Sequence, residues 1–186
     1  SVESQEELFR VQDLVSSRQN IRPLQNSTMA WADYDNDGDL DLAIAGRDAD
    51  GIARSLLYNN QFNTLVENTG VVLPGIQDGD LAWADYDNDG DLDLALTGAT
   101  ASGNRNTHLY RNQLESGDFA LNISNLKNMP QLANSSIDWA DYDNDGDLDF
   151  ALMGTGSGKR ITAIFRNEKG TFFEDTTQSL TPMDNG

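Results

Sequence analysis

The apolar residues of this chain fall into short runs rather than into long helical stripes. The run Leu40–Gly46 is apolar at almost every position, and so are Leu92–Gly98 and Leu148–Gly154, which is typical of strands buried on both faces. Clusters of Gly, Asn, Asp and Ser separate the runs, as short hairpin turns require. The pattern predicts an all-β protein, and it lacks the long 3.6-residue periods of a helical repeat.

The apolar runs belong to a unit that occurs three times. Trp31, Trp83 and Trp139 open the same sixteen-residue stretch, at spacings of 52 and 56 residues. A second marker, in which an aromatic residue precedes a polar residue and Asn, recurs at 57–60, 109–112 and 164–167. A period near 50 residues with several short strands per unit is typical of the four-stranded blades of a β-propeller. The sequence therefore predicts three antiparallel blades, with the three tryptophans packed in the core between blades.

Four strands, a to d, can be placed in each unit. Strand a is expected at 28–34, 80–86 and 136–142. Strand b is expected at 40–46, 92–98 and 148–154. Strand c carries the aromatic marker and is expected at 55–60, 106–112 and 161–167. Strand d, the outer and least regular strand, is expected at 63–68, 118–124 and 171–176.

The predicted division of the chain is a leading segment followed by three blades. Blade 1 covers 28–79, blade 2 covers 80–135, and blade 3 with a C-terminal tail covers 136–186. Residues 1–27 are expected to form a leading strand and loop, with a short helix at 5–15 as the alternative. Closed propellers have about four to eight blades, so three blades predict a partial propeller or part of an oligomeric ring. Further blades in a longer chain, or association of copies, would cover the exposed end strands.

Five aspartates lie within nine residues of each unit, directly before strand b. The net charge of the chain is −19, and fifteen of its 31 acidic residues belong to these three motifs. Carboxylates at this density repel one another unless a cation lies among them. A hard cation is therefore expected in each unit, about three per chain, and a solvated acidic turn without metal is the alternative.

The spacing of the motif assigns a role to each aspartate. Alternate residues of a tight loop turn inward, so Asp33, Asp35 and Asp37, at positions 1, 3 and 5, are expected to converge on one point. Asp39, at position 7, is expected to offer its main-chain carbonyl and to leave its carboxylate in solvent, while Asp41 closes the shell. Oxygen ligands in a flexible number favour Ca²⁺ over Mg²⁺. The corresponding residues are Asp85, Asp87, Asp89, Asp91 and Asp93 in the second unit, and Asp141, Asp143, Asp145, Asp147 and Asp149 in the third.

The loop differs from the EF-hand, the commonest calcium loop with similar spacing. An EF-hand needs a bidentate glutamate at position 12 and a helix on each side. Position 12 is Ile44, Leu96 or Leu152, and the predicted flanking elements are strands. An EF-hand is therefore excluded.

Asp-x-Asp-x-Asp-Gly-x-x-Asp between two strands, followed by an apolar run ending in Gly, resembles the FG-GAP/VCBS repeats of integrin α-subunit propellers and bacterial secreted proteins. The resemblance covers residues 28–176 and implies that each loop binds Ca²⁺ through the fifteen aspartates named above. The Phe-Gly and Gly-Ala-Pro motifs, after which the integrin repeat is named, are absent apart from Gly98-Ala99. The bacterial type is therefore the closer likeness, and integrin-type ligand recognition is not implied.

Composition excludes several functions. The chain has no cysteine and one histidine, so disulfides, thiolate sites and zinc clusters are excluded. Strong acidity argues against nucleic acid and anionic membranes as partners, and no apolar run of about 18 residues could span a membrane. His108 is expected at the surface, and no nucleophile with a base and an orienting group is visible, so we expect no enzyme. Extracellular calcium modules bind at roughly 10⁻⁴–10⁻³ M, which indicates a secreted or cell-surface protein.

The basic residues are expected on the face opposite the calcium loops. The loops between strands b and c, together with the d-to-a segments, hold eight of the twelve basic residues: Arg47, Arg54, Arg105, Lys159, Arg160, Arg18, Arg22 and Lys127. This face could bind an acidic glycan or an acidic protein surface, or could merely balance the acidic face. An adhesion or carbohydrate-binding module is therefore the leading hypothesis, a structural spacer is second, and a hydrolase is third.

Overall fold

The computed structural model describes residues 20–113, 118–121 and 129–178, and these residues form twelve strands and no helix. The first sheet contains β1 (Gln25–Ala32), β2 (Asp41–Arg47), β3 (Ala53–Asn60) and β4 (Leu65–Glu67). The second contains β5 (Gln77–Ala84), β6 (Asp93–Ala99), β7 (Arg105–Gln113) and β8 (Asp118–Leu121). The third contains β9 (Ala133–Ala140), β10 (Asp149–Gly156), β11 (Lys159–Glu168) and β12 (Thr171–Glu174). The all-β prediction is confirmed.

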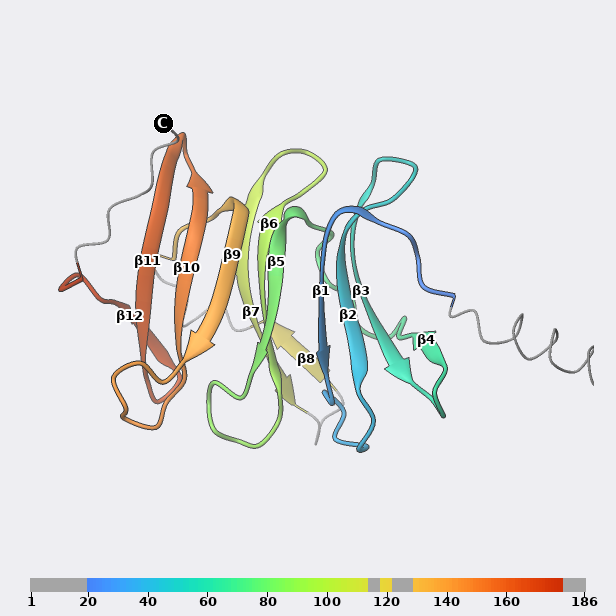
Figure 1. Ribbon diagram of the computed structural model, residues 1–186, viewed down its shortest axis with the longest axis horizontal. Helices are drawn as coiled ribbons and strands as arrows, with labels where there is room; N and C mark the ends of the chain where they lie inside the picture. The colour runs from blue at the N-terminus through green and yellow to red at the C-terminus, as the bar shows by residue number, and fades with distance from the viewer. Residues whose placement is uncertain (1–19, 114–117, 122–128, 179–186) are drawn as a thin grey trace, which may run out of the picture.

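Each sheet is an antiparallel meander in chain order, as a propeller blade requires. The three sheets stand side by side, with β1 packed beside β5 and β5 beside β9 (Figure 1). The described residues make an open row of three blades, and no closed ring is formed within them. The predicted four-stranded antiparallel blades are therefore present.

Strand a ends earlier than the sequence pattern predicted. β1, β5 and β9 stop at Ala32, Ala84 and Ala140, two residues before the predicted ends. The next residue in each case is the first aspartate of the motif, whose carboxylate binds loop amides instead of continuing the strand. The predicted leading strand, or helix, falls mostly on residues 1–19, which lie outside the described residues, and residues 20–24 form no strand.

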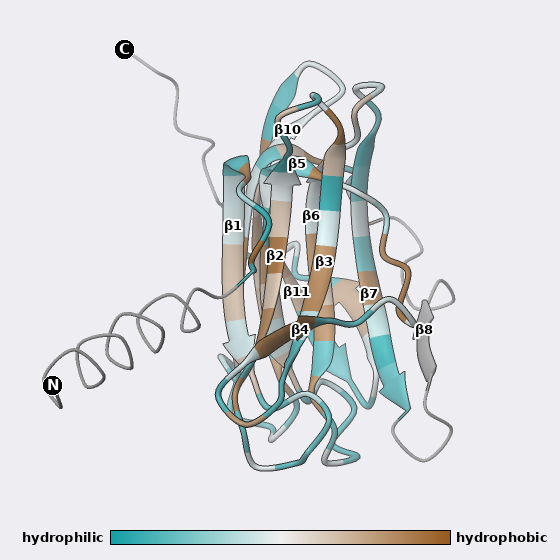
Figure 2. Ribbon diagram, turned by 90° about the vertical axis from the view of Figure 1, so that its right-hand side faces the viewer, coloured by the Kyte–Doolittle hydropathy of each residue, from teal (hydrophilic) through white to brown (hydrophobic). Residues whose placement is uncertain are grey.

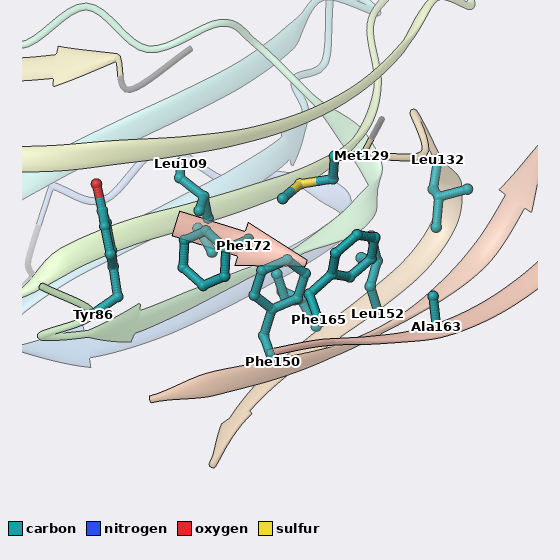
Figure 3. Close-up of a cluster of buried hydrophobic side chains, with 11 residues drawn as sticks. Tyr86, Leu109, Met129, Leu132, Phe150, Leu152, Ala163, Phe165 and Phe172 are labelled. Atoms are coloured by element: carbon teal, nitrogen blue, oxygen red, sulfur yellow. The ribbon is translucent and has the colours of Figure 1, made fainter. Parts of the chain in front are cut away.

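The cores lie between the sheets. Leu57 of β3, Leu81 of β5 and Leu96 of β6 belong to the core between the first and second sheets. The core between the second and third sheets is aromatic and includes Phe150 and Phe165 (Figure 3). Figure 2 shows that the strands carry the hydrophobic residues, whereas the loops at the lower end of the sheets are mostly hydrophilic.

Two of the three tryptophans pack between blades as predicted. The ring of Trp83 stacks on Tyr34 of the preceding blade, with centroids 5.7 Å apart and planes within 10°. Trp139 stacks on Tyr86 at 6.1 Å and 6°. The prediction is wrong for Trp31, which is 53% exposed because no blade precedes it within the described chain.

Candidate metal centres

The loop between strands a and b folds around its first aspartate. Asp33 accepts the amide of Asp37 at Oδ1 (3.0 Å) and the amide of Gly38 at Oδ2 (3.1 Å). Asn36 and Gly38 have φ values of 56° and 95°, in the left-handed region that Asn and Gly adopt most readily. The same hydrogen bonds recur around Asp85 and Asp141, so the three loops share one conformation.

The structure brings three carboxylates together in each loop. One oxygen from each member lies within 4.8 Å of the others in three groups: Asp33, Asp35 and Asp37; Asp85, Asp87 and Asp93; Asp141, Asp143 and Asp149. Positions 1 and 3 of the motif occur in all three groups. Position 5 joins the first group, whereas position 9 joins the second and third. The first loop thus brings together the predicted positions 1, 3 and 5, whereas position 9 takes the place of position 5 in the second and third loops.

The aspartate at position 9 also joins strand b to strand c, a role that was not predicted from the sequence. Asp41, Asp93 and Asp149 are buried at the start of strand b. Each accepts, at Oδ1, the amide of an asparagine on strand c at 2.7–2.8 Å. Those residues are Asn60, Asn112 and Asn167, the final residue of the recurring aromatic marker. The recurrence of that Asn was the signal that could have revealed this contact.

Burial makes the negative charge of these carboxylates costly. Burial raises the pKa of Asp41 to about 6 and the pKa of Asp93 to about 7. Burial and the neighbouring charge of Asp37 also raise the pKa of Asp35, and burial and Asp89 do the same for Asp87. A cation among these groups would remove the penalty by favouring their ionised forms.

The donor atoms fit a hard cation. Within the part of the chain that the structure describes, Asp35 Oδ1, Asp41 Oδ2 and Asp87 Oδ1 are buried and accept no hydrogen bond of ordinary geometry. A buried carboxylate oxygen without a donor is unfavourable by several kcal/mol unless another positive group approaches it. The candidate ligand atoms of the three groups are all carboxylate oxygens, which is the ligand set of Ca²⁺ or Mg²⁺ rather than of zinc.

Asp39 is exposed, as predicted, whereas the aspartates at position 7 of the second and third loops bind a neighbouring loop. Asp91 Oδ1 accepts the side-chain amide of Asn36 from the preceding loop at 3.0 Å. Asp147 Oδ1 likewise accepts the amide of Asn88 at 2.8 Å. Position 7 therefore links the second and third loops to the loop of the preceding blade, because adjacent loops lie at the same end of adjacent sheets (Figure 1).

A polar residue of strand c contacts the carboxylates of the first two loops, and the identity of this residue differs between them. In the first loop Asn59 donates to Asp35 Oδ2 at 2.9 Å. At the equivalent place in the second loop, the Arg111 guanidinium lies 2.5 Å from Asp87 Oδ2 and 2.8 Å from Asp89 Oδ2. Sequence analysis missed both residues, although they occupy the third position of the recurring marker. The second loop thus carries an internal positive charge, whereas the first carries a neutral amide.

Replacing Arg111 should strengthen cation binding in the second loop. Arg111→Asn reproduces the first loop and removes a charge that competes for Asp87 and Asp89, so we expect calcium affinity to rise roughly 3- to 10-fold. The measurement is calorimetric titration in a background where Asp37→Ala and Asp143→Ala disable the other loops. Arg105→Asn changes the net charge equally at the other end of the sheet and is the matched control. Equal effects of the two substitutions would contradict this role of Arg111.

The raised carboxyl pKa values also predict a pH dependence of stability. Folded pKa values of about 6 for Asp41 and about 7 for Asp93 exceed the unfolded value near 3.9, so the metal-free folded state binds more protons between those limits. The metal-free melting temperature should therefore fall by several degrees from pH 5 to pH 8. With Ca²⁺ bound, the carboxylates stay ionised and stability is instead lost as the pH falls. Parallel slopes in thermal unfolding with and without Ca²⁺ would contradict the prediction.

The other predicted residues lie away from the loops. The end opposite the loops carries exposed Arg47, Arg105 and Lys159, while Arg54 pairs with buried Asp48 at 2.9 Å. Arg18 and Lys127 lie outside the described residues. His108 is half-buried on β7 rather than at the surface, 6.1 Å from the Tyr110 ring, and burial lowers its pKa.

Comparison with known proteins supports the repeat. A family model for the FG-GAP-like repeat matches residues 33–96. No curated protein and no solved structure matched the chain. In the described residues, no helical segment has the length and hydropathy needed to span a bilayer. The matched segment runs from the first aspartate of the first loop, through the second loop, into β6. The resemblance found in the sequence is thereby confirmed over residues 33–96, which are similar to the FG-GAP-like repeat.

Proposed function

We propose that the chain is a calcium-binding propeller module of a secreted or cell-surface protein, in which one Ca²⁺ braces each blade. The observation that carries the proposal is the threefold recurrence of converging carboxylates, two of whose loops contain buried oxygens without ordinary hydrogen bonds. The fifteen aspartates of the motifs are the proposed ligands or close neighbours of the ions. The role of Ca²⁺ is structural, and the proposal assigns no catalytic residue to the chain.

The position of each loop explains how an ion would brace a blade. The loop joins strands a and b, and its position-9 aspartate binds the amide of strand c. An ion held by positions 1, 3 and 9 would therefore connect three of the four strands. Native-state binding of this kind stabilises the fold by RT ln(1 + [L]/Kd), and extracellular calcium fills sites with Kd near 10⁻⁴–10⁻³ M. Sites of this affinity support a location outside the cell.

The end opposite the loops is the proposed recognition surface. Arg47, Arg105 and Lys159 are exposed there and could attract an acidic glycan or an acidic protein surface. Arg54 contributes less free charge, because Asp48 neutralises it. A spacer within a larger surface protein is the alternative, and it requires no ligand at this end.

Glycan-array binding tests the recognition role. We expect binding to carboxylated or sulfated glycans in Ca²⁺, and its loss when Arg47, Arg105 and Lys159 are changed together to Glu. Arg54 is left intact, because its removal would leave the buried carboxylate of Asp48 without its cation. The control reverses Lys169, an exposed basic residue of the turn between β11 and β12 at the loop end. Absence of any binding in Ca²⁺, or binding that survives the triple reversal, would favour the spacer.

A further inference from the structure

The contacts between consecutive blades are repeated at both interfaces of the chain. A tyrosine ring of one blade stacks on a tryptophan of the next, as in Tyr34–Trp83 and Tyr86–Trp139. A strand-c asparagine of the following blade donates to the carbonyl of the same tyrosine at 2.6 Å, from Asn112 to Tyr34 and from Asn167 to Tyr86. The loop contact from Asn36 to Asp91 recurs from Asn88 to Asp147. Each interface thus joins the tyrosine-bearing face of one blade, here called its trailing face, to the tryptophan-bearing face of the next blade, called its leading face.

Blade 1 presents a leading face that lacks its partner in the described chain. Trp31 and Met29 are 53% and 64% exposed, whereas Leu81 and Ile137, which correspond to Met29, are buried. Asn60 donates to Leu40 O at 3.2 Å, as its counterparts do to Leu92 and Leu148, but among the described residues no tyrosine carbonyl meets it.

The segment before β1 packs against its sheet in the same way as the segments before β5 and β9. Ile21 and Leu24 pack against the core of the first sheet, which contains Leu42, Ile44 and Tyr58. The equivalent segments before β5 and β9 fill the interblade cores with Leu73 and Ile76, and with Met129 and Leu132. Blade 1 therefore differs from an interior blade chiefly in what its Trp31 and Met29 contact.

Blade 3 presents the complementary trailing face. Tyr142 and Met153 are 36% and 51% exposed, although the residues equivalent to them in blades 1 and 2 are buried: Tyr34, Tyr86, Ala45 and Thr97. Tyr142 lines a hollow of about 150 Å³ together with Ala140, Ala151 and Ile164. In the two formed interfaces, the tyrosine at this place is covered by the tryptophan of the next blade.

We propose that a second copy of this chain supplies the missing blade, with its Trp31 stacked on Tyr142. By analogy with the two formed interfaces, Asn60 of the second copy then donates to the Tyr142 carbonyl, and Asn144 donates to Asp39 of the second copy. Both faces belong to the same chain, so the contact is heterologous and occurs twice in a two-copy ring. Such a ring has six blades, within the range of closed propellers, and it leaves no exposed end blade. This inference goes beyond the proposed function and does not depend on the identity of the ion.

Mass measurement by light scattering and sedimentation between 1 and 100 µM tests the proposal. In saturating Ca²⁺ the chain should have about twice its monomer mass of 20.4 kDa. Trp31→Ala and Tyr142→Ala should each weaken association at least about 30-fold, as central aromatic contacts do. Met153→Asp should weaken it about 10-fold or more without disturbing the monomer fold, because Met153 is exposed. Val72→Ala, at an exposed residue of the loop between β4 and β5, should leave the mass unchanged.

Mixing two variants provides a sharper test of the head-to-tail arrangement. Trp31→Ala chains keep an intact Tyr142 face, and Tyr142→Ala chains keep an intact Trp31 face. A mixture can therefore form one complete interface and should associate more tightly than either variant alone. A monomer at 100 µM, a dimer indifferent to all three interface substitutions, a mixture without rescue, or a mass that grows without limit would overturn the two-copy ring.

Discussion

Removing Ca²⁺ should lower the melting temperature of the chain by about 10–30 °C. At free calcium 10 to 100 times Kd, each filled site contributes about 1.4–2.7 kcal/mol, and each kcal/mol is worth roughly 2–4 °C in a chain of this length. The structural reason is the buried carboxylates of the three loops, whose charge is uncompensated without a cation. Thermal unfolding followed by circular dichroism, with EDTA and then with excess Ca²⁺, measures the change and its reversal.

Ion identity and site number provide the controls for this result. Mg²⁺ at equal concentration should restore less of the melting temperature, because its small octahedral shell suits a cage of several carboxylates less well. Asp37→Ala should remove about a third of the calcium effect, by weakening one site of three. Asp50→Ala, an exposed aspartate in the β2–β3 loop, should remove none. A melting temperature that is indifferent to chelator would contradict the metal assignment.

The second large effect is expected in the core between blades 2 and 3. Phe150 is almost fully buried, and its ring centroid lies 4.9 Å from that of Phe165 and 5.1 Å from that of Phe172 (Figure 3). The ring centroid of Trp139 lies 5.2 Å away. Phe150→Ala removes these contacts and leaves a cavity, at a cost of about 3–5 kcal/mol in the free energy of unfolding. Denaturant unfolding in saturating Ca²⁺ measures the loss.

An exposed phenylalanine provides the matched control for this substitution. Phe62 is 95% exposed, so Phe62→Ala should change the free energy of unfolding by less than about 0.5 kcal/mol. A loss below about 1 kcal/mol for Phe150→Ala would contradict the close packing of this aromatic cluster.

The fold was predictable because the same signals occur three times. The apolar runs of strand b and the aromatic marker of strand c placed their strands correctly, to within a few residues. Strand a was placed two residues too far along, because the first aspartate of the motif binds loop amides and ends the strand. The exposure of Trp31 in the described chain was not predictable, since the three copies of the motif are almost identical around their tryptophans.

The candidate site was predictable in its residues but only partly in its contacts. Spacing identified the aspartates at positions 1 and 3, which converge in all three loops. Spacing did not reveal Arg111, because it lies more than twenty residues from Asp87 and reaches it only through sheet pairing. The link from Asn36 to Asp91 was equally hidden, since it depends on how adjacent blades sit beside each other.

Calcium stoichiometry tests the central claim most directly. Equilibrium dialysis of the metal-depleted chain against millimolar Ca²⁺, with the bound ion measured by atomic emission, should give three ions per chain. Asp35→Ala should reduce the number to two, and Asp35→Ala with Asp87→Ala and Asp143→Ala should reduce it to none. Uptake of no calcium at 10 mM, or uptake of three ions by the triple variant, would contradict the account.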